Sequence, residues 1–227
     1  MQVRLHVPFA TRFRTMLAGW GTVGIFYSIG RIAPGNARIL PEGALDRLVP
    51  FDAWAVWLYL SFFALVPAAY FCAPAQRLRP LMRAMQISAI LAGFVFVSWP
   101  TTLIYPAVAS HTISGMALRF LAGSDSAKNC LPSLHGALTL LCMLALWQRE
   151  KPVRSILVLL WGLAIMWSVI AARRHLALDL GAGIALGGTA WLAMRLLAAP
   201  AGAPMREATS TEAGAGPHPR PEPETGP

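Results

Sequence analysis

Long apolar stretches alternate with short polar connections along most of the chain. The stretches run to roughly 20 residues, the length of an α-helix that crosses the hydrocarbon layer of a bilayer. Because lipid offers the backbone no hydrogen-bonding partners, a chain that crosses it must form helices or a closed barrel, and stretches of this length favour helices. The six stretches are residues 16–32, 53–73, 84–104, 132–147, 153–172 and 176–197. The pattern therefore predicts an all-α fold, a bundle of six transmembrane helices.

Two flanking segments and one connection differ from these stretches. Residues 1–15 are basic and lack a convincing cleavage site for a signal peptide, so we expect a retained N-terminal segment. Residues 200–227 contain many Pro, Gly and Glu and no large apolar run, which predicts a disordered tail. Residues 38–51, RILPEGALDRLVPF, fit either a short amphipathic helix on the membrane surface or an ordinary loop. The membrane domain is thus expected over residues 16–199.

The composition agrees with a protein that lies in a membrane. Of the 227 residues, 56% are hydrophobic and only 13% are charged, and the mean hydropathy is +0.54. The net charge of +9 comes from 19 Lys and Arg residues that are spread over every connection. Since they form no single basic stripe, we expect no nucleic-acid partner.

The distribution of basic residues predicts the orientation in the membrane. Twelve of the 19 lie in the N-terminal segment, the second and fourth connections and the C-terminal flank, and seven lie on the opposite side. The positive-inside rule therefore places both termini in the cytoplasm. Only two of the 19 are Lys, and this bias together with abundant Ala is common in GC-rich bacterial genomes. We expect a multi-pass protein of a bacterial inner membrane.

The three cysteines indicate neither disulfide bonds nor a metal site. Cys72, Cys130 and Cys142 lie in or beside apolar stretches. Their number and spacing fit neither a set of disulfides nor a zinc site. We therefore expect no metal and no cofactor.

Polar residues that can do chemistry gather at the beginnings of two apolar stretches. One group is NCLPSLH at residues 129–135, where Pro132 suits a first helical turn and Ser133 can cap neighbouring N–H groups. The other is RRHLALD at residues 173–179. Ionisable residues at membrane depth are costly and usually mark function. In the predicted orientation, both groups face the outer side.

The second group contains a histidine and a carboxylate at helical spacing. His175 and Asp179 are four residues apart, so the carboxylate can accept a proton from one imidazole nitrogen and leave the other as a nucleophile. His135 begins another helix on the same side, where it could donate a proton to a leaving group. A histidine at a helix end that is merely satisfied by a nearby acid is the alternative reading of the His175 spacing.

A basic group of residues surrounds these histidines in the sequence. Free N–H groups at the two helix starts, together with Lys128, Ser133, Arg173 and Arg174, would bind a phosphate dianion. Ser133 could equally be only a cap, and the two arginines could be residues that reach toward the membrane interface. Two histidines, one carboxylate and basic ligands together predict phosphoryl transfer through a phosphohistidine.

These residues resemble the motifs of the PAP2 superfamily of membrane phosphatases and phosphotransferases, over roughly residues 46 to 190. A Pro-Ser-small-or-apolar-His motif at the fourth span is matched by Pro132, Ser133, Leu134 and His135. A His-x-x-x-Asp motif at the sixth span is matched by His175 and Asp179. The resemblance implies a six-span bundle of PAP2 type, with His175 as nucleophile, Asp179 as its orienting partner and His135 as the acid for the leaving group.

The chain also departs from the superfamily pattern. The basic motif expected at the outer end of the third span is missing, because residues 99–106 read WPTTLIYP, and Arg79-Pro80 is expected on the cytoplasmic side. Val169 stands where an Arg six residues before the second histidine is usual. Leu134 replaces the Gly of many phosphatases. These features resemble the inositol phosphorylceramide synthase-like branch, which transfers a phosphorylated head group between lipids.

Several functions remain open from the residues. The leading prediction is a phosphatase or phosphotransferase of lipid metabolism, which acts on a lipid phosphate or phospholipid of the bilayer. The first alternative is a head-group transferase of the inositol phosphorylceramide synthase-like kind. A non-catalytic membrane protein of the same fold is a lesser alternative. A metal-dependent hydrolase with His135, His175 and Asp179 as ligands is disfavoured because no further acidic cluster accompanies them.

Overall fold

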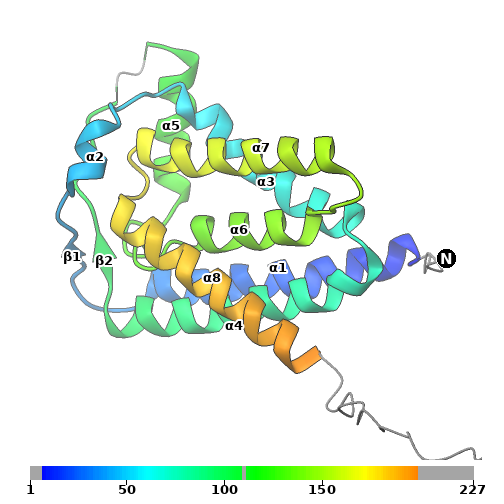
Figure 1. Ribbon diagram of the computed structural model, residues 1–227. Helices are drawn as coiled ribbons and strands as arrows, with labels where there is room; N and C mark the ends of the chain where they lie inside the picture. Colours follow the sequence, from blue (N-terminus) through cyan, green and yellow to red (C-terminus); the bar gives the residue numbers. More distant parts are fainter. Residues whose placement is uncertain (1–6, 109–110, 199–227) are drawn as a thin grey trace, which may run out of the picture.

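A computed structural model describes residues 7–108 and 111–198 of the chain (Figure 1). Within these residues the fold is all-helical except for two short strands that pair in parallel. The helices are α1 (Phe9–Ile32), α2 (Ala44–Leu48), α3 (Ala55–Cys72), α4 (Ala75–Ser98), α5 (Ile113–Ser124), α6 (Leu134–Leu146), α7 (Pro152–Ala171) and α8 (Ala177–Ala198). The strands are β1 (Arg38–Ile39) and β2 (Thr101–Thr102). The disordered tail predicted for residues 200–227 lies outside the described residues.

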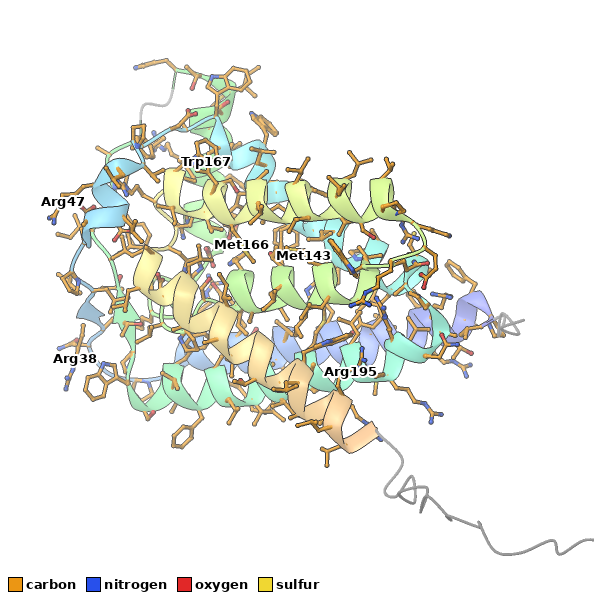
Figure 2. All side chains as sticks on the ribbon, viewed as in Figure 1. Arg38, Arg47, Met143, Met166, Trp167 and Arg195 are labelled. Carbon is orange, nitrogen blue, oxygen red and sulfur yellow. The ribbon has the colours of Figure 1, made fainter. Side chains whose placement is uncertain are left out.

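Successive long helices run in opposite directions through the bundle (Figure 1). Helix α4 packs against α1, α6 and α8, and α3 packs against α7 and α6. The start of α1 and the end of α8 lie at one end, which we call the terminal end (Figure 1). The strands, α2 and the turn between α7 and α8 lie at the other end, which we call the loop end. Figure 2 shows Arg38 and Arg47 at the loop end and Arg195 farther along α8.

Four helices have the length and composition to cross a membrane: α3, α4, α7 and α8. Helix α6 is apolar but has only 13 residues, and the 24 residues of α1 include arginines near both ends. Many large apolar side chains face outward from the bundle, among them Phe94 at 72% exposure and Leu160 at 57%. Such a surface suits contact with lipid. The protein is therefore a membrane protein with at least these four candidate spans among the described residues.

The third apolar stretch differs from its predicted bounds, residues 84–104. Helix α4 begins earlier, at Ala75, and ends earlier, at Ser98. It ends before Pro100 because the residue before a proline disfavours helical backbone. It begins early because Arg77, although charged, finds hydrogen-bond partners within the bundle. Arg77 donates hydrogen bonds to the carbonyl of Leu144 in the last turn of α6 and to that of Trp147, the residue after the helix, which would otherwise lack partners.

The sequence pattern did not predict the elements that form in two connections of the loop end. The segment 38–51 contains both strand β1 and the five-residue helix α2, so neither of the two interpretations describes all of it. Helix α5 lies in what the pattern treated as a connection. Its 12 residues are too few for a span, and Thr112 caps it by accepting a hydrogen bond from Gly115 N at 3.0 Å.

Glycines bring the starts of α6 and α8 together. A Cβ atom at Gly183 would collide with the carbonyl oxygen of Ser133, and one at Gly187 would lie 2.6 Å from the carbonyl oxygen of Ala137. Small residues of this kind let helix backbones approach closely. Ser133 N also donates a hydrogen bond to the backbone oxygen of Asp179 at 2.9 Å. The two predicted chemical groups therefore lie side by side.

A segment of the loop end covers the turn between α7 and α8. The buried carboxylate of Asp46 accepts hydrogen bonds from Gly43 N at 2.7 Å and from Ala177 N, in the first turn of α8, at 2.6 Å. Asp52 N donates to Ala171 O at 2.9 Å. The carboxylate at the start of α8 is also favoured by the helix dipole. Residues 46–52 thereby fix the turn that carries the second histidine.

Candidate active site

Two histidine rings meet at the loop end of the bundle. His135 lies in the first turn of α6, and His175 lies two residues before α8. Nδ1 of His135 is 3.2 Å from Nε2 of His175, a hydrogen-bonding distance. The structure therefore brings together the two histidines that the sequence placed at separate helix starts.

Asp179 holds the second histidine from the opposite side of its ring. Its Oδ2 lies 2.7 Å from His175 Nδ1. Its Oδ1 accepts hydrogen bonds from Leu176 N at 2.6 Å and Leu180 N at 3.1 Å, and the side chain is fully buried. A carboxylate with two backbone donors accepts from Nδ1–H, which leaves the lone pair on Nε2. The nitrogen of His175 that faces His135 is thus the one available as a nucleophile.

Ser133 caps the helix that carries His135. Its Oγ accepts a hydrogen bond from Gly136 N at 3.3 Å, and the residue is fully buried. Pro132 precedes this cap and so lies outside the first turn where the sequence pattern placed it. The cap therefore accounts for Ser133 structurally, and its role as a phosphate ligand stays a prediction.

Arg174 is a buried cation beside the histidines. Its Nη2 lies 2.9 Å from Oδ2 of Asp125, and its guanidinium carbon lies 4.7 Å from the centre of the Tyr105 ring. The side chain is only 4% exposed. Its Nε has no hydrogen-bond partner among the residues that the structure describes. Burial opposes the charge, but the adjacent carboxylate raises the pKa of Arg174 above its ordinary value.

Asp125 is a polar residue of this cluster that the sequence pattern did not identify. It follows α5 and lies in the connection to α6, where Tyr27 donates a hydrogen bond to its Oδ1. Burial of Asp125 opposes its ionisation, yet nearby His135, Arg174 and the Tyr27 hydroxyl hold its pKa below the ordinary value. The sequence did hold one indication of its importance, because Asp125 is the only acidic residue between residues 53 and 149.

Two other predicted phosphate ligands lie apart from the histidines. Lys128 Nζ donates hydrogen bonds to the carbonyls of Gly35 and Ala33, at 2.9 and 3.4 Å. The Arg173 guanidinium donates to the carbonyls of Asp46 and Val49, at 2.9 and 3.1 Å. Both side chains thus donate hydrogen bonds to the connection between α1 and α3. Their binding of phosphate stays a prediction.

The backbone at Arg173 orients the two neighbouring arginines differently. Its φ of +50° lies in the left-handed region, which is uncommon for residues other than glycine. The two hydrogen bonds of its side chain to the covering segment stabilise this conformation. As a result, Arg173 reaches outward to that segment, whereas Arg174 reaches into the buried cluster.

A cavity of about 260 Å³ reaches the cluster from between α1, α3, α5 and α6. Its wall includes His135 and Asp125, and most of the remaining wall is aromatic or aliphatic. The ring of His135 packs against Tyr59 and Phe62, with ring centres 4.7 and 4.8 Å away. The cavity therefore joins a long apolar wall to a short polar end at His135.

A family model of the PAP2 superfamily matches residues 42–193 of the chain. The match includes both histidines, Asp179, Arg174 and Asp125, and leaves α1 outside. A search of curated proteins finds no match. Since the matched region covers well over half of the sequence and contains the whole histidine cluster, the chain belongs to the PAP2 superfamily.

Proposed function

We propose that the protein is a membrane phosphatase or phosphotransferase that acts on a lipid phosphate through a phosphohistidine on His175. The observation that carries the proposal is the continuous chain from Asp179 through His175 to His135, with contacts of 2.7 and 3.2 Å. Such a chain has the parts that nucleophilic catalysis needs: a nucleophile, a group that orients it and a proton donor. Membership of the PAP2 superfamily supports the same class of reaction.

The proposed reaction has two displacements at phosphorus. In the first, Nε2 of His175 forms a bond to phosphorus, the bond from phosphorus to the lipid oxygen breaks, and His135 gives its proton to that oxygen. In the second, water or an alcohol attacks phosphorus, the nitrogen–phosphorus bond breaks, and His135 takes the proton of the attacking group. Asp179 holds Nδ1–H of His175 throughout and stabilises the positive charge that develops on the ring.

The resting distance between the histidines sets a requirement on substrate binding. At 3.2 Å the two nitrogens share a hydrogen bond and leave no room for a phosphorus atom between them. The phosphoryl group must therefore replace this hydrogen bond and separate the rings. We propose that the free Nε of Arg174, the start of α6 at Ser133 and the N–H groups there supply the new contacts. Lys128 and Arg173 are candidates for a second set of ligands.

We also propose that all six long helices cross the membrane, with both termini in the cytoplasm and the histidines on the periplasmic side of a bacterial inner membrane. The alternating directions of the helices support this arrangement (Figure 1). Helix α6 is short for a span, but Arg77 supplies partners for its last carbonyls and lets the helix end below the surface. We propose residues 16–199 as the catalytic domain, flanked in the cytoplasm by residues 1–15 and 200–227. Helix α1 begins at Phe9, seven residues before the predicted start of the first span, so its first two turns belong to the flanking segment.

A head-group transferase of the inositol phosphorylceramide synthase-like kind is the second candidate. The observation that favours it is the low number of free cations at the histidines, because Arg174 is the cation of the buried cluster and is already paired with Asp125. Doubly charged phosphate needs more positive charge than a singly charged phosphodiester. Leu134 in place of glycine beside His135 is the sequence feature that agrees.

The experiment that tests the proposal traps the phosphorylated enzyme. Purified protein is mixed with a lipid whose phosphoryl group is radiolabelled, quenched in alkali, and analysed for phosphohistidine by mass spectrometry. We expect the label on His175 and none in His175→Ala. His135→Ala should lose about 10² to 10⁴ in rate on the natural lipid, and lose less when the leaving group is a nitrophenol that needs no proton. His111→Ala, an exposed histidine outside the cluster, is the matched control.

The possible outcomes separate the candidates. Label that remains in His175→Ala would disprove the assigned nucleophile. Equal rescue of His135→Ala and His175→Ala by the nitrophenyl substrate would contradict the separate roles assigned to the two histidines. Failure of the wild type to form phosphohistidine with any lipid phosphate or phospholipid would support a non-catalytic protein of this fold. Label transferred to an added lipid alcohol instead of water identifies the transferase.

A further inference from the structure

Asp125 takes no part in the two displacements, although it lies beside the groups that carry them out. Its side chain is 12% exposed and bridges the buried Arg174 and the partly buried Tyr27. One oxygen accepts the hydrogen bond of Tyr27, and the other lies 2.9 Å from Nη2 of Arg174. It also lines the same cavity as His135. A second carboxylate so close to a phosphate site is unexpected, because it repels the substrate.

The charges of the cluster nearly cancel. Arg174 contributes one positive charge, and the carboxylates of Asp125 and Asp179 contribute two negative charges. His135 adds one positive charge when it carries the proton for the leaving group. Lys128 and Arg173 make their hydrogen bonds to backbone carbonyls of the loop end and none to the cluster. The charges of the cluster itself therefore sum to about zero before the substrate arrives.

We propose that Asp125 is a specificity-determining residue that makes the site select the singly charged phosphodiester of a phospholipid over the doubly charged phosphomonoester. The inference rests on the proposed function, because it assumes that a phosphoryl group binds between His175 and His135. It goes beyond that function by naming the ionic class of substrate and the residue that sets it.

The geometry of Arg174 provides the first reason. Asp125 occupies Nη2 of the guanidinium, and Nε is left without a partner among the described residues. The carboxylate of Asp125 compensates the charge of Arg174, so the guanidinium offers a phosphoryl group hydrogen-bond donors but little net positive charge. The two negative charges of a phosphomonoester need that positive charge more than the single charge of a phosphodiester does.

The low exposure of the cluster provides the second reason. Repulsion between like charges grows as the surrounding dielectric constant falls, so a carboxylate that is mostly buried acts strongly on a neighbouring anion. Each additional negative charge on the substrate meets this repulsion. The ionised form of Asp125 persists at neutral pH, because Arg174 and Tyr27 stabilise it.

The test compares two lipids that differ by one methyl group. Phosphatidic acid is a phosphomonoester, and its methyl ester, phosphatidylmethanol, is a phosphodiester with one charge fewer. Release of diacylglycerol from each lipid at pH 7.5 gives kcat/KM for both. We expect wild-type protein to prefer phosphatidylmethanol. Asp125→Asn should raise the ratio of monoester to diester kcat/KM by about tenfold, which corresponds to about 1.4 kcal/mol.

Three further variants separate charge from structure. Asp125→Glu keeps the charge and should keep the wild-type ratio. Tyr27→Phe removes a hydrogen bond to Asp125 but leaves its carboxylate, so the preference for the diester should remain. Glu42→Gln removes one negative charge from an exposed residue of the loop end that does not contact Arg174, and it should change neither rate.

Each result decides the inference. A wild-type preference for phosphatidic acid overturns it without any variant. An unchanged ratio in an active Asp125→Asn protein also overturns it, while the phosphohistidine mechanism stands. An equal fall of both rates would mean that Asp125 only holds Arg174 in place, which overturns it as well. The absence of phosphohistidine in wild-type protein with both lipids defeats the proposed function itself.

Discussion

At the scale of single residues, each charged group of the buried cluster has a specific partner. Arg174 pairs with Asp125, and Asp179 pairs with His175. Removing one member of a buried ion pair costs about 3–5 kcal/mol, because the other is left uncompensated. These residues were not equally visible in the sequence. The spacing of His175 and Asp179 can be recognised within one segment, whereas the partner of Arg174 lies 49 positions away.

The roles of the neighbouring arginines can be separated by anion inhibition. We expect Arg174→Lys, which keeps the charge but loses the fork, to weaken inhibition by inorganic phosphate or vanadate by about tenfold or more. Arg173→Ala should instead lower the unfolding temperature in detergent, because the carbonyls of Asp46 and Val49 lose their donors. A matched loss of inhibition in Arg173→Ala and Lys128→Ala would show that these two residues do bind phosphate.

At the scale of elements, the apolar pattern predicts which segments are helices better than where they end. Helix α8 begins one residue from its predicted start. Helix α4 begins nine residues before its predicted start. Arg77 fits within the helix because its guanidinium donates a hydrogen bond to a carbonyl of α6. Helix α5 was missed, since only its neighbours reveal that a short amphipathic segment packs at the loop end. Tertiary partners decide both cases.

The close packing of α6 against α8 makes a prediction about two glycines on one helix. Gly183→Ala should destabilise the protein by about 1–3 kcal/mol, because the new methyl group collides with Ser133 and must move the start of α6. The same displacement should slow formation of phosphohistidine by shifting His135. Gly181→Ala is the matched control, since no atom lies within 4 Å of its added Cβ. Thermal unfolding in detergent checks both, and equal destabilisation would contradict the packing argument.

At the scale of the whole molecule, the histidine cluster could be predicted because it depends mainly on orientation. Once two helix starts face the same side of a membrane, His135 and His175 are confined to the same layer, and the glycines of α8 complete the approach. The position of Asp125 could not be predicted in this way. It depends on Tyr27 in α1 and on the packing of α5, which hydrophobic patterning does not specify.

The orientation of the bundle can be tested with its own cysteines. Cys72 is exposed at the end of α3, on the terminal end, whereas Cys130 and Cys142 are buried. Burial and the neighbouring carboxylate of Asp179 raise the pKa of Cys130 to about 12, so that thiol should stay unreactive. In intact cells, a membrane-impermeant maleimide should label Glu42→Cys in a Cys72→Ser background, and should label wild-type Cys72 only after the membrane is permeabilised. The single variant Cys72→Ser provides the background. Glu42 precedes α3 in the chain and Cys72 is its last residue, so a membrane-spanning α3 puts them on opposite sides. Labelling of both from the same side would refute the six-span arrangement and the periplasmic site together.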